Sequence, residues 1–156
     1  MSVRPVHLIA AAALLTSLLL TGCSGSGSSA SSTTSSSTTI SSDPCRAGYQ
    51  AAASRLNSVA RYFSQAAQNG QMNEQFAGFA SDYVAAMKTF DSTVSALPCT
   101  GAVKEDLTQL VAAQTALEPL VAQFAAGQRP AVAEFNAAAA AVGDAVKRVN
   151  AALGIS

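Results

Sequence analysis

From Asp43 onwards, apolar residues recur alternately every three and four positions, and this spacing limits the fold more than any other feature of the chain. The pattern divides into four runs, which extend from Pro44 to about Gln68, from Asn73 to Leu97, from Thr100 to Gly127 and from Pro130 to Gly154. Each run would place its apolar side chains on one face of an α-helix, with the spacing of helices that pack at about 20° to one another. The sequence therefore predicts an all-α fold.

Short turn sequences separate the four runs. Asp43 can cap free N–H groups, Pro44 suits the first helical position, and Asn69-Gly70 tolerates the left-handed backbone that ends many helices. Because short turns make consecutive helices antiparallel, we expect an up-down-up-down four-helix bundle over residues 43–156. Two loosely joined helical hairpins are the alternative. On each predicted helix, the residues at this three-and-four spacing form a seam that we expect to face the core. The seam residues are Tyr49, Ala52, Leu56, Val59, Phe63 and Ala66, then Phe76, Ala80, Tyr83, Met87, Phe90, Val94 and Leu97, then Val103, Leu107, Leu110, Gln114, Leu117, Val121 and Phe124, and finally Val132, Phe135, Ala139, Val142, Val146, Val149 and Leu153.

The N-terminus has a different character from the predicted bundle. Residues 1–7 carry Arg4, and an almost wholly apolar segment follows from Leu8 to Leu20. At about 1.5 Å per residue this segment is roughly 20 Å long, which is shorter than the ~30 Å of bilayer hydrocarbon. A short apolar core after a basic start is typical of a signal peptide, and a transmembrane anchor is the alternative.

The sequence Leu20-Thr21-Gly22-Cys23 directly follows the apolar segment. It resembles the lipobox of bacterial membrane lipoproteins, and the tract that follows is similar to that of actinobacterial lipoproteins. The resemblance implies that residues 1–22 are removed and that Cys23 becomes the acylated first residue of the mature protein. Two or three acyl chains would hold it durably on the extracytoplasmic face of the cell membrane. A plain secreted protein that is cut nearby is the alternative.

Residues 24–42 are nearly all Ser, Thr, Gly and Ala and carry no charge. Such a segment buries too little apolar surface to offset the entropy lost on ordering its backbone. We therefore expect the lipidated Cys23 and this segment to form a disordered tether over residues 23–42. As a flexible coil the segment would span roughly 25 Å. A bare spacer and an O-glycosylated stalk both fit this composition.

The cysteines support the same organisation. If Cys23 carries lipid, Cys45 and Cys99 remain as an even pair in an exported protein, where disulfides can form. If the chain reverses near Gly70, these two residues come together at one end of the first helical hairpin. We therefore predict a disulfide between Cys45 and Cys99, and two free thiols are the alternative.

The predicted mature chain lacks the residues on which most catalytic and metal sites depend. The one histidine, His7, lies in the predicted signal peptide, so the commonest general base and metal ligand would be lost. No Gly-rich phosphate loop, HExxH or GxSxG motif is present. Removing Arg4 leaves eight of the nine Lys and Arg against nine Asp and Glu, a balance that argues against nucleic-acid binding. We expect no enzyme activity, no cofactor and no metal ion.

Two residues of the third predicted helix depart from its pattern. Gln114 occupies a seam position, and Pro119 lies inside the run, where it leaves the Thr115 carbonyl without its usual partner. Gln114, Thr115 and Pro119 could thus form a small polar cleft. The other interpretation is that Gln114 sets helix register and Pro119 only fits the curvature. Charged residues such as Asp91 fall off the apolar stripes, and we expect them on a solvated face.

These observations predict a non-enzymatic envelope lipoprotein whose helical domain is a binding or interaction module, with membrane lipid and an envelope protein as its expected partners. The alternative is a carrier of a small apolar ligand, held either by the aromatic residues of the first hairpin or at the Gln114–Pro119 kink. An apolar pocket of several hundred Å³ would support the carrier, and a solidly packed bundle would remove it.

Overall fold

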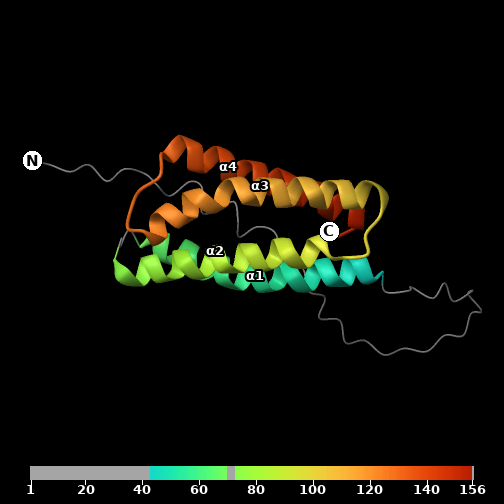
Figure 1. Cartoon of the computed structure of the whole chain (residues 1–156), viewed down its shortest axis with the longest axis horizontal. Coiled ribbons are helices and arrows are strands. Elements are labelled where there is room, and N and C mark those ends of the chain that lie inside the picture. The colour runs from blue at the N-terminus through green and yellow to red at the C-terminus, as the bar shows by residue number, and fades with distance from the viewer. Residues whose placement is uncertain (1–42, 70–72, 156) are drawn as a thin grey trace, which may run out of the picture.

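The computed structural model of the chain describes residues 43–69 and 73–155. The predicted signal peptide, Cys23, the tether and Gly70 lie outside these residues. Within them the fold is all-α, as predicted, with four helices and no strand. The helices are α1 (Pro44–Gln68), α2 (Glu74–Ser95), α3 (Gly101–Ala125) and α4 (Val132–Leu153). They form a helical bundle and extend side by side along its long axis (Figure 1).

Local sequence explains where the first two helices begin. The Asp43 side chain accepts a hydrogen bond from the Cys45 backbone N–H at 3.0 Å, which caps α1. Asn73 caps α2 in the same way, accepting from the backbone N–H of Phe76 at 3.0 Å. Helix α4 begins at Val132 and not at Pro130 as expected, since the backbone of Ala131 is still extended (φ −60°, ψ 124°).

The core contains the expected faces of α2 and α3. Every seam residue predicted for them is buried except Val103 and Leu97, which are partly buried, and Leu97 lies just after the end of α2. The buried faces of α1 and α4 differ from the prediction in that they include small residues beside the seam, namely Ala53, Ala60, Ser64 and Ala145. Val132 was wrongly placed in the core: its side chain is 39% exposed, because α4 only begins there.

The disulfide between Cys45 and Cys99 is confirmed, with a Cα–Cα distance of 5.1 Å. It joins the first turn of α1 to the connection between α2 and α3, and both cysteines are buried. The bond therefore ties the first helix to the end of the first hairpin, which is where the sequence placed it.

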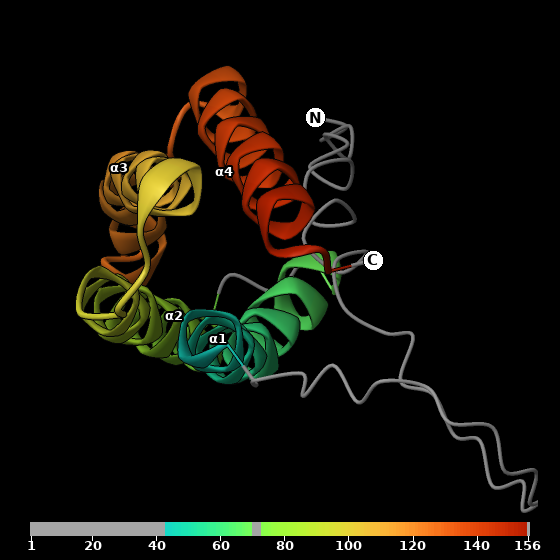
Figure 2. The same ribbon diagram turned by 90° about the vertical axis from the view of Figure 1, so that its right-hand side faces the viewer.

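The bundle is open on one side. Helix α1 packs on α2, α2 on α3 and α3 on α4, whereas the backbones of α1 and α4 hardly approach each other. In the view along the helices, the four surround a common centre (Figure 2). No helix among residues 43–69 and 73–155 is long and apolar enough to cross a membrane. The side between α1 and α4 is therefore where the centre of the bundle is least covered.

Candidate functional site: a pocket between α1 and α4

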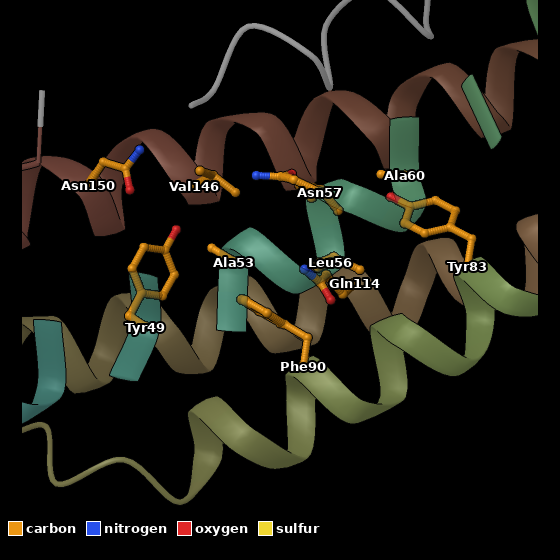
Figure 3. Close-up of a pocket in the computed structure, with 11 residues that line it drawn as sticks. Tyr49, Ala53, Leu56, Asn57, Ala60, Tyr83, Phe90, Gln114, Val146 and Asn150 are labelled. Atoms are coloured by element: carbon orange, nitrogen blue, oxygen red, sulfur yellow. The ribbon is translucent and has the colours of Figure 1, made fainter. Parts of the chain in front are cut away.

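A pocket lies at the centre of the bundle, and all four helices contribute to it (Figure 3). Its cavity volume is about 50 Å³, and the figure is about 520 Å³ when open solvent at its mouth is included. The residues that line it are Tyr49, Ala53, Leu56, Asn57 and Ala60 of α1, Tyr83 and Phe90 of α2, Gln114 of α3, and Val142, Val146 and Asn150 of α4. The smaller figure already leaves room for more than one water molecule, which needs about 10–15 Å³.

Small side chains on α1 and α4 account for the empty space. Ala53 and Ala60 are buried on α1, and Val142 and Val146 face them from α4. Alanine and valine cannot bridge two helices whose backbones hardly approach each other. The pocket is thus a consequence of both the helix arrangement and the residues that the sequence places there.

The polar groups of the pocket are neutral. Burial raises the pKa of both Tyr49 and Tyr83 to about 12, so both hydroxyls keep their protons at neutral pH. In Figure 3 the Tyr49 hydroxyl points toward the α4 side of the pocket, where Asn150 lies. Asn57 and Asn150 are half-buried, and no lysine, arginine, aspartate or glutamate lines the pocket. The site therefore offers hydrogen bonds without a fixed charge.

Gln114 is the most unusual residue of the pocket. Its side chain is only 3% exposed, and its Oε1 has no hydrogen-bond partner among the residues that the structure describes. A buried acceptor without a partner costs roughly 1–3 kcal/mol relative to a paired one. A polar side chain in such a place needs an explanation, and a donor that enters the pocket would provide one.

The structure separates the three residues of the predicted polar cleft. Gln114 lines the pocket, but Thr115 and Pro119 are exposed and do not. The Thr115 hydroxyl donates to the Val111 carbonyl at 2.9 Å within α3, and the helix continues through Pro119. At about 100° per residue, Thr115 and Pro119 lie roughly 100° and 140° around the helix from Gln114, so the three residues face different directions.

Asn57 and Asn150 line the pocket and were not predicted from the sequence. Each follows another lining residue, Ala53 or Val146, by one helical turn and therefore shares its face. This spacing of four residues was a usable signal.

Asp91 was wrongly assigned to a solvated face. It is half-buried on α2, and its Oδ1 is fully buried without a hydrogen-bond partner. The pKa of Asp91 is raised to about 7, mainly by burial and to a smaller extent by the negative charge of Glu118 on α3 and a hydrogen bond with the Glu118 side chain. The two carboxyl groups meet where α2 packs on α3, which no stripe within a single helix could indicate.

Comparisons of the chain with protein-family models, with curated proteins and with solved structures found no match. Among residues 43–69 and 73–155, no three His, Cys, Asp or Glu side chains gather where they could hold a metal ion. The pocket is therefore the feature of the described fold from which a function can be argued.

Proposed function

We propose that the chain is a membrane-anchored, extracytoplasmic binding protein that holds a small, largely apolar ligand between α1 and α4. The pocket with the unpaired Gln114 Oε1 is the observation that carries this proposal. Apolar walls with a few convergent polar groups are the usual composition of small-molecule sites, while the volume of about 50 Å³ is below the several hundred Å³ of a site for a drug-sized ligand. The proposal includes no catalytic step, no cofactor and no metal ion.

The proposed membrane anchor is acylated Cys23, with residues 24–42 as the tether after removal of residues 1–22. The lipobox-like sequence Leu20-Thr21-Gly22-Cys23 supports it, as does the parity of the cysteines, since Cys45 and Cys99 pair with each other. We further propose an antiparallel up-down-up-down order for the helices. The short connections at 96–100 and 126–131, between helices that pack on each other, support that order.

A second candidate function is docking to an envelope protein. It is favoured by Tyr62, which is 59% exposed and stacks on the half-buried ring of Phe79 with 6.2 Å between ring centroids. Exposed aromatic side chains are enriched at protein interfaces. A single exposed ring pair is a weaker reason than a pocket to which all four helices contribute, so the ligand carrier ranks first.

The carrier function is tested by filling the pocket. Ala53→Phe would place a large ring among the lining residues, whereas Ala51→Phe adds the same ring at an exposed position of the same helix. Each full-length protein is purified from membranes in mild detergent, its fold is checked by circular dichroism, and co-purified small molecules are identified by mass spectrometry. We expect a compound in the wild type and in Ala51→Phe that is lost from Ala53→Phe. If no compound accompanies the wild type, or Ala53→Phe retains it, the carrier proposal fails.

The anchor is tested separately in cells grown with an alkyne-tagged fatty acid. We expect the wild-type protein to carry the tag and to sediment with membranes, and Cys23→Ser to lose both properties. An untagged wild-type protein recovered from the medium would contradict the anchor without affecting the pocket.

A further inference from the structure

We infer that the ligand is an uncharged molecule about the size of a single substituted ring, with a hydrogen-bond donor that reaches Oε1 of Gln114. This inference rests on the proposed carrier function and names the chemical class of its ligand. Three properties of the pocket lead to it, namely its charge, its unpaired acceptor and its volume.

The side chains that line the pocket are uncharged. No ionisable side chain other than Tyr49 and Tyr83 lines the pocket, and both hydroxyls are neutral because burial raises their pKa to about 12. A carboxylate or ammonium group in this position would lose its hydration without gaining a partner of opposite charge. Such burial costs several kcal/mol, so the pocket discriminates against ions of either sign.

The unpaired acceptor selects for a donor. Gln114 is 97% buried (100% minus the 3% exposed), lines the pocket, and its Oε1 has no partner among the described residues. An O–H or N–H group on the ligand would complete the hydrogen bonding of Oε1. A ligand without a donor leaves Oε1 buried and unpaired, and a site with such a group rejects that analogue.

The volume limits the size of the ligand. The space of about 50 Å³ for the centres of water molecules is too small for an acyl chain of membrane length, while the opening between α1 and α4 allows part of a ligand to remain outside. Leu56 and Phe90 supply apolar walls, and Asn57 and Asn150 are half-buried, so they could meet a polar substituent. The cavity has about a third of the ~150 Å³ that holds a benzene ring, so a single ring with a short polar arm would lie partly in the opening between α1 and α4.

The test uses four probes of nearly equal size on the purified full-length protein: benzyl alcohol, toluene, benzoate and benzylammonium. The variant is Gln114→Met, which keeps the volume of the side chain and removes its strong acceptor. Thr115→Val is the control, because it changes an exposed neighbour on the same helix. Binding is measured by NMR titration, and urea unfolding verifies that each variant is folded.

In the wild type we expect both ions to bind at least about tenfold more weakly than benzyl alcohol. In Gln114→Met we expect the affinity for benzyl alcohol, relative to that for toluene, to fall about tenfold, while Thr115→Val leaves the ratio unchanged. A ratio that Gln114→Met does not alter, or tight binding of either ion, overturns the inference but leaves the carrier function standing. If no probe binds the wild type, the pocket holds only water, and both the inference and the carrier function fall.

Discussion

Asp91 makes the stability of the protein depend on pH in a direction that can be worked out from the structure. Its pKa rises from 3.8 to about 7 on folding, because of burial and of the neighbouring Glu118. The folded protein therefore retains a proton that the unfolded chain releases between about pH 4 and pH 7. Wherever the native state binds more protons, the free energy of unfolding falls as pH increases. The contribution of Asp91 is thus most favourable below about pH 4, declines up to about pH 7 and is constant above it.

The size of the effect follows from the same shift. A change of about three pKa units (7 minus 3.8) corresponds to an upper bound of about 4 kcal/mol. The carboxyl is only half-buried, so solvent screens much of this penalty, and we expect about 1–2 kcal/mol to remain. Asp91→Asn removes the charge and should increase the free energy of unfolding by that amount at pH 8, with little change at pH 4.

Urea unfolding followed by circular dichroism at both pH values measures this difference. Asp82→Asn is the matched control, since Asp82 is exposed on the same helix, and we expect it to change the free energy of unfolding by less than about 0.5 kcal/mol at either pH. Glu118→Gln should recover the smaller part of the gain at pH 8, because burial is the larger cause of the pKa shift. An Asp91→Asn variant that is less stable at pH 8, or equally stabilised at both pH values, would refute the reasoning.

Two further predictions concern covalent and local stabilisation. Replacing both Cys45 and Cys99 by alanine should lower the free energy of unfolding by about 4 kcal/mol, because the bond closes a loop with a sequence separation of 54. Urea unfolding measures this loss. A loss below about 1 kcal/mol would show that the disulfide does not restrain the unfolded chain. Gly78→Ala should increase the free energy of unfolding by about 0.5–1 kcal/mol and so raise the melting temperature, since no atom lies within 4 Å of the added methyl group. Gly48→Ala should gain less, because its methyl group would displace Leu97, and equal gains would contradict this account.

The parts of the fold that sequence could predict are those decided within one helix or across one short turn. The caps at Asp43 and Asn73 depend on residues within the first turn of the helix. The seam of α2 is apolar at every third or fourth position, which leaves one face to bury. The disulfide between Cys45 and Cys99 required only that the chain reverse once between them.

The parts that sequence could not predict depend on how far apart two helices lie. Periodicity shows which face of α1 and of α4 is apolar, but not that their backbones hardly approach each other. The raised pKa of Asp91 arises partly from Glu118 on the next helix, which no stripe within α2 contains. Gln114 was recognised as a departure from the seam, but its partners were sought along α3, whereas the pocket brings it to residues of the other three helices.

Two departures from good packing occur in one place, and together they favour a bound ligand. Elsewhere in the bundle large rings fill the centre, as where Phe63 lies 5.4 Å from Phe76 and 5.9 Å from Phe124 between ring centroids. Between α1 and α4 the chain instead has small residues such as Ala53, and it places the unpaired amide of Gln114 beside the empty space. Either feature alone would lower stability and could be removed by a single substitution. Their coincidence is what a binding site requires, because one molecule with an apolar body and a donor would fill the space and pair the acceptor together.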